Sequence, residues 1–90
     1  MTEYHSIKEF NTAERLYLEA IDLQSLEQFD LALKNLFKAR NILLFVLIDS
    51  SINTNMYYSR CNNLYFKVKE KINELKIIKK VFGNQTDINI

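Results

Sequence analysis

The sequence predicts an all-α fold, a three-helix antiparallel bundle. Three observations predict it: the 90 residues contain no proline and one glycine, apolar residues recur at helical spacing, and a single polar cluster interrupts that spacing. Without proline and glycine the chain lacks the residues that mark hairpins, sandwiches and phosphate loops. A chain of this length is also limited to one core. We therefore expect one bundle over residues 1–83, followed by a tail or the start of a linker at 84–90.

The three helices are placed by apolar periodicity at about residues 6–26, 28–49 and 54–82. Ser6 and Glu9 have the spacing of a capping box and predict the first start. A change of phase near residues 25–28 predicts the first turn, and the polar run 49–55 predicts the second. Gly83 is expected to cap the third helix at its carboxyl end.

Charge is uneven although the net charge is only +1. Residues 1–30 hold seven acids and two bases, a net of −5, whereas residues 60–80 hold seven bases and two acids, a net of +5. An acidic first helix and a basic third helix would attract each other and leave one basic side. A nearly neutral domain lacks the overall charge of a nucleic-acid binder, so we expect no nucleic acid among its partners.

Catalysis has little support in the sequence. The only histidine, His5, precedes the first helix, and the only cysteine, Cys61, lies on the apolar stripe of the third. No phosphate-loop or zinc-ligand spacing is present. We therefore predict a chain that is not an enzyme and has no cofactor and no metal. A single cysteine fits a reducing, cytoplasmic setting, and the longest apolar run, residues 42–48, is too short to span a bilayer.

The hairpin of the first two helices resembles the MIT domain, the microtubule-interacting and trafficking module. Its spacing matches that family's pattern of alanines, an aromatic that opens the second helix and an Ala-Leu pair, carried here by Ala20, Phe29, Asp30, Ala32, Leu33, Leu36 and Ala39. A looser match follows in the third helix, at Val68, Ile72, Leu75 and Lys76. Tetratricopeptide hairpins share much of this spacing, so a TPR-like adaptor remains an alternative.

The resemblance implies a protein-interaction module. MIT domains bind short tail motifs of ESCRT-III-type subunits and recruit the protein that carries them to membrane-remodelling or endosomal-sorting sites. The expected partners are acidic amphipathic peptide tails. The expected location is cytoplasmic, with endosome association and membrane contact arising indirectly, through those partners.

A binding groove is expected between the second and third helices, because residues 42–48 are apolar on all sides and must be covered on more than one face. The predicted walls are Ile42, Phe45 and Val46, facing Tyr65, Lys69 and Ile72. Lys67, Lys69 and Lys71 are predicted to contact the carboxylates of the partner. The alternative from another class is a structural or oligomerising bundle, in which a homodimer contact covers the same apolar residues.

Overall fold

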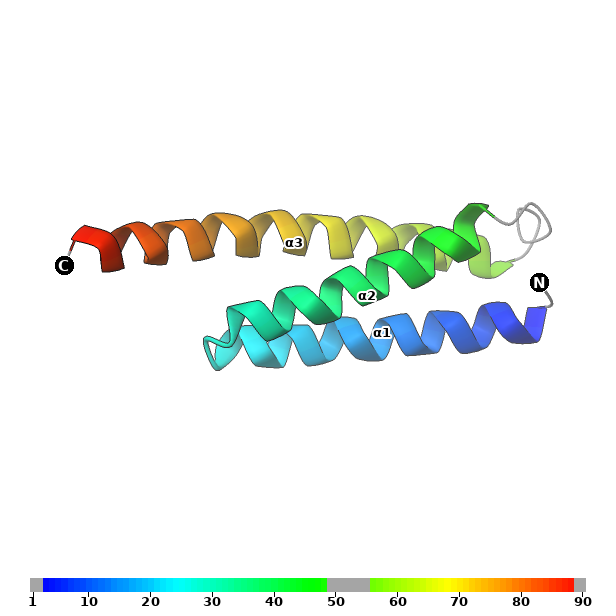
Figure 1. Ribbon diagram of the computed structural model, residues 1–90. Helices are drawn as coiled ribbons and strands as arrows, with labels where there is room; N and C mark the ends of the chain where they lie inside the picture. Colours follow the sequence, from blue (N-terminus) through cyan, green and yellow to red (C-terminus); the bar gives the residue numbers. More distant parts are fainter. Residues whose placement is uncertain (1–2, 49–55, 89–90) are drawn as a thin grey trace.

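The computed structural model describes residues 3–48 and 56–88 and contains three α-helices: α1 (Glu3–Ser25), α2 (Phe29–Ile48) and α3 (Met56–Ile88). Helices α1 and α2 form an antiparallel hairpin, and α3 runs back along α2 (Figure 1). Helix α3 packs mainly against α2 and less against α1. The predicted all-α three-helix bundle is confirmed.

The turn between α1 and α2 is a Schellman motif without glycine. The Glu27 N–H donates to the Gln24 carbonyl and the Gln28 N–H to the Leu23 carbonyl, both at 2.9 Å. These two bonds satisfy carbonyls at the end of α1 that have no partner within the helix. Glu27 takes the left-handed conformation that the motif requires, with φ of 61°. The hairpin therefore closes at residues 26–28, where the change of phase placed it.

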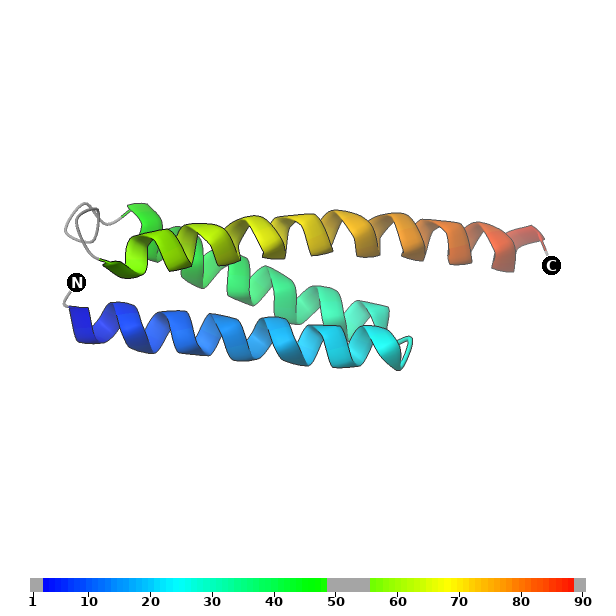
Figure 2. The same cartoon turned by 180° about the vertical axis from the view of Figure 1, so that it is seen from behind.

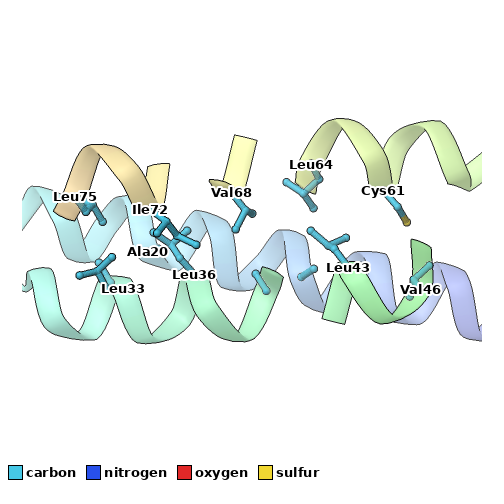
Figure 3. Close-up of a cluster of buried hydrophobic side chains, with 13 residues drawn as sticks. Ala20, Leu33, Leu36, Leu43, Val46, Cys61, Leu64, Val68, Ile72 and Leu75 are labelled. Carbon is cyan, nitrogen blue, oxygen red and sulfur yellow. The ribbon is translucent and has the colours of Figure 1, made fainter. Parts of the chain in front are cut away.

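The core is a single cluster of buried apolar side chains that joins all three helices. Figure 3 shows side chains of α2 and α3 pointing toward one another, such as Leu33 and Leu75. Four fully buried alanines lie on α1 and α2: Ala13, Ala20, Ala32 and Ala39. Small side chains allow two helix backbones to approach closely. The alanines thus explain why α1 and α2 form the most extensive helix pair of the bundle.

The helix ends differ from the predicted ones. Helix α1 begins at Glu3, so Ser6 lies inside its first turns rather than at its start. Helix α3 continues through Gly83 to Ile88, over residues predicted as a tail. One glycine disfavours a helix by only about 1 kcal/mol, and no proline follows to stop it. The loop predicted at 49–55 and the start of the third helix near Thr54 lie outside the described residues.

Helix α3 determines the long dimension of the molecule. The extents are 54 × 18 × 14 Å, and 33 helical residues span about 50 Å at 1.5 Å per residue. Seen from behind in Figure 2, the carboxyl-terminal part of α3 extends well beyond the α1–α2 turn. Lys79 forms an ion pair with Asp30 of α2 near that turn, on the last part of α3 that lies beside the hairpin.

We expect substitutions of Glu27 to change the free energy of unfolding according to how easily the new residue adopts the left-handed backbone conformation of the turn. Glu27→Gly should raise the free energy of unfolding by up to about 1 kcal/mol, because glycine adopts positive φ without steric cost. Glu27→Val should lower it by about 1 kcal/mol or more, because a β-branched residue is strained there. Urea denaturation of both variants measures the difference, and equal stabilities would contradict this account of the turn.

A second prediction concerns the core. Leu36 of α2 is fully buried, whereas Leu31 of the same helix is 49% exposed. Leu36→Ala should lower the free energy of unfolding by about 2–5 kcal/mol, because it removes buried methyl groups and leaves a cavity. Leu31→Ala is the matched control and should cost less than about 1 kcal/mol. Similar losses from both substitutions, measured by urea denaturation, would be inconsistent with the described packing of α2.

Candidate functional site

A pocket of about 320 Å³ lies between α2 and α3. Both helices contribute its lining, which consists of Arg40, Asn41 and Leu44 from α2 and Tyr65, Lys69, Ile72, Asn73 and Lys76 from α3. Leucine, isoleucine and tyrosine side chains provide its apolar part, and the remaining five residues are cationic or amide side chains. This combination of an apolar surface with a few polar groups is typical of a recognition site.

Helical spacing explains why these residues come together. On α3 the buried stripe runs through Val68, Ile72 and Leu75. Tyr65, Lys69 and Lys76 follow one another at four and seven residues, so they form a second row along one flank of that stripe. On α2, Arg40 and Leu44 are one turn apart and face this row across the antiparallel helix pair. The pocket is thus the groove between this row of α3 and the facing side of α2, next to the buried core.

The charge of the pocket is its most distinctive property. Three cations line it, Arg40, Lys69 and Lys76, and no carboxylate does. Within residues 3–48 and 56–88 none of the three forms an ion pair. By contrast, two other lysines of α3 have acidic partners: Lys71 lies 2.7 Å from Glu74, and Lys79 pairs with Asp30. The pocket therefore concentrates uncompensated positive charge between two helices.

Aromatic rings position these cations. The Arg40 Cζ lies 5.0 Å and the Lys76 Nζ 5.6 Å from the centre of the Phe37 ring. The Lys69 Nζ lies 5.4 Å from the centre of the Tyr65 ring. A cation over an aromatic face gains about 0.5–1 kcal/mol at an exposed site. Phe37 and Tyr65 thus favour side-chain positions at the pocket while leaving the cationic groups able to contact a ligand.

The α3 side of the pocket contains three residues singled out in the sequence, because Tyr65, Lys69 and Ile72 all line it. Ile72 is 3% exposed, so it forms part of the floor and also belongs to the core. Lys67 and Lys71 do not line the pocket. They are separated from Lys69 by two residues on either side, which is roughly 200° around the helix axis. The three lysines predicted to act together therefore lie on opposite flanks of α3.

The α2 side differs from the prediction. The wall was expected from Ile42, Phe45 and Val46, but none of the three lines the pocket. Val46 is fully buried in the core, and Phe45 is 63% exposed.

Ile42 is packed against the core on the side of α2 that faces α1. It lies two turns after Asn35, whose side chain donates a hydrogen bond of 3.4 Å to Glu19 of α1. The apolar run 42–48 offered no periodicity from which to choose its faces, whereas the actual wall, Arg40, Asn41 and Leu44, is mostly polar and lies partly before that run.

Exposed apolar side chains continue beyond the pocket along the end of α2. Leu44 at the pocket is 42% exposed, and Ile48, one turn further on, is 72% exposed. The pocket therefore has two ends of different character. The end near Phe37 is cationic, whereas the end near Leu44 merges into an apolar surface.

The surroundings of Cys61 do not suggest a reactive thiol. Cys61 is fully buried, and burial raises the pKa of its thiol because desolvation disfavours the thiolate. Residues 3–48 and 56–88 contain no group of three or more His, Cys, Asp or Glu side chains placed to bind a metal ion. Within the same ranges, no helix has both the length and the apolar character needed to cross a membrane.

Comparisons with known proteins add no relative to this description: no family model matches the chain, and neither a curated protein nor a solved structure does.

The environment of Cys61 leads to a reactivity prediction. A buried thiol with a raised pKa is protonated near neutral pH, and the thiolate is the reactive form. We expect modification of Cys61 by a disulfide reagent to be about two orders of magnitude slower in native buffer than in urea, because it requires opening of the core. Absorbance of the released chromophore measures the rate. Equally fast labelling with and without urea would show that α3 does not bury this residue.

Proposed function

We propose that this chain is a protein-interaction module that binds an acidic amphipathic peptide in the pocket between α2 and α3. The observation that carries the proposal is the set of three cations, Arg40, Lys69 and Lys76, that line the pocket without a carboxylate partner among the described residues. Acidic side chains of a partner would compensate them. Apolar side chains of the same partner would cover Leu44 and the edge of Ile72.

The sequence resemblance to the MIT domain supports a more specific form of this proposal. In that form the partners are tail motifs of ESCRT-III-type subunits, and the chain recruits its carrier to membrane-remodelling or endosomal-sorting sites. Contact with the membrane would then be indirect, and association with endosomes would depend on the partner. In this proposal the chain itself would contribute binding and no catalysis.

A second candidate function is that of a structural or oligomerising bundle. The observation in its favour is the exposure of large apolar side chains on the outer faces of α2 and α3, among them Phe45, Ile48 and Ile77, each more than 60% exposed. A homodimer would cover such residues. Analytical ultracentrifugation separates the two candidates, since a monomer that binds acidic peptide supports the module, whereas a tight dimer without peptide affinity supports the structural function.

The peptide-binding proposal is tested by reversing charge on one flank of α3 at a time. Lys69→Glu should weaken binding of a fluorescent ESCRT-III-type acidic tail peptide by about tenfold or more, equivalent to about 1.4 kcal/mol, because it places an anion in the pocket. Lys67→Glu is the matched control, with the same charge change on the opposite flank, and should have a small effect. Fluorescence anisotropy measures both affinities.

Two results would count against this proposal. Equal affinity of the Lys69→Glu variant and the unchanged chain would show that the pocket does not take part in peptide recognition. Equal losses from Lys69→Glu and Lys67→Glu would mean that overall charge, rather than the pocket, governs binding.

A further inference from the structure

The charge of the pocket exceeds what one carboxylate can compensate. Arg40, Lys69 and Lys76 together carry +3, and the other lining residues are uncharged at neutral pH. A glutamate or aspartate of a bound peptide brings a charge of −1 and two acceptor oxygens. A phosphorylated serine or threonine brings about −1.5 to −2 and three strong acceptors. Its charge and its number of acceptors therefore match a pocket lined by three cations better than a single carboxylate does.

The arrangement of the cations also favours a compact, highly charged group. Arg40 and Lys76 both lie over the ring of Phe37, so two like charges share the same end of the pocket. An anion bound in the pocket would be attracted by both of these cations. Arg40 has a planar guanidinium with several donors in fixed directions, which suits the oxygens of a phosphate. Lys69, held over Tyr65, approaches from the other end of the same lining.

We propose that the pocket recognises a phosphorylated serine or threonine within the partner peptide, with an apolar residue of that peptide beside it on Leu44. This inference rests on the proposed function and specifies its partner. Phosphorylation of the partner would then increase its affinity for the module. The site would act as a reader of that modification in addition to binding acidic side chains.

A peptide fits these observations better than a phosphorylated lipid in a membrane. The cations lie in a pocket between two helices that includes Leu44 and Ile72, whereas a bilayer surface contacts a broad basic face. The same chain carries a net charge of −5 over residues 1–30. Most of these residues belong to α1, whose acids would be repelled by an anionic bilayer.

The experiment uses the whole 90-residue chain and three acidic amphipathic peptides that differ at one central position: serine, glutamate or phosphoserine. Fluorescence anisotropy measures the three affinities. At about pH 7.5 the phosphoserine peptide should bind about fivefold to tenfold more tightly than the glutamate peptide, because it forms additional charge-assisted hydrogen bonds. Equal affinities of these two peptides would overturn the inference and leave the proposed function standing. Failure of all three to bind would contradict the proposed function itself.

The pH dependence provides a second readout. The second pKa of a phosphate monoester is about 6, so the advantage of the phosphoserine peptide should shrink at about pH 5.5, where it loses one negative charge. Glutamate keeps its charge at that pH. The ionisable groups that line the pocket are Arg40 of α2 and Tyr65, Lys69 and Lys76 of α3, with no histidine or carboxylate among them. A constant ratio of affinities at the two pH values would contradict recognition of the phosphate dianion.

Charge-matched variants test whether the preference for phosphoserine arises in this pocket. Lys76→Gln should reduce the preference for phosphoserine over glutamate several-fold, whereas Lys67→Gln, with the same loss of charge on the opposite flank, should leave it unchanged. Arg40→Lys keeps the charge but removes the planar donors, and should lower the preference while retaining binding of the glutamate peptide. A preference lost equally in Lys76→Gln and Lys67→Gln would overturn the assignment to this pocket. Binding of vesicles containing a phosphoinositide with no phosphopeptide preference would overturn it as well.

Discussion

The close packing of α1 against α2 is the constraint on which the rest of the bundle depends. Four alanines, Ala13 and Ala20 on α1 and Ala32 and Ala39 on α2, are fully buried and allow the two backbones to approach. The Schellman turn holds this pair in register through its two bonds to Gln24 and Leu23. Because α1 occupies one flank of α2, only the other flank remains for α3. The packing of α1 against α2 therefore determines where α3 and the pocket lie.

Charge is distributed over α3 according to flank. On one side Lys71 pairs with Glu74 within the helix, and near the turn Lys79 pairs with Asp30 of α2. On the other side Lys69 and Lys76 lie over aromatic rings and have no carboxylate partner among the described residues. Exposed ion pairs contribute little stability, typically below about 1 kcal/mol. These pairs therefore contribute little to the fold, and they leave Lys69 and Lys76 as cations at the pocket.

Apolar periodicity in the sequence is sufficient to predict the fold, but it does not predict the α2 side of the pocket. The buried stripes of α2 and α3, such as Leu36 and Leu43 or Val68 and Leu75, keep helical spacing, so the three helices and their inward faces could be predicted. The turn could be located only from a shift in the helical spacing of the apolar residues, because Glu27 occupies a position where glycine is the usual signal. The ends were less predictable, since neither Ser6 nor Gly83 terminates a helix.

The candidate site could be predicted on α3, where the apolar spacing is regular, and could not be predicted on α2. Ile72 lies on the regular buried stripe of α3, and Tyr65 and Lys69 lie beside it, so all three were identified. The residues from α2 were missed because the run 42–48 is apolar on all sides and gives no preferred face. The signal that could have found more of the site lies on α3, where Lys76 follows Lys69 at seven residues and therefore shares its face. Arg40 could be recognised only once the structure had placed it over Phe37 and beside α3.

The overall charge of the chain bears on how the proposed peptide partner would be recognised. The net charge is +1, and removing the three pocket cations from it leaves −2 for the remainder of the chain. A chain with this balance has no strong attraction for anionic polymers at a distance, since charges beyond roughly one Debye length of about 8 Å are screened at physiological salt. Arg40, Lys69 and Lys76 could act together on an anion only within the pocket that all three line. Under the proposed function, a partner would therefore have to present its negative charge beside an apolar face that covers Leu44, and charge alone would not be enough.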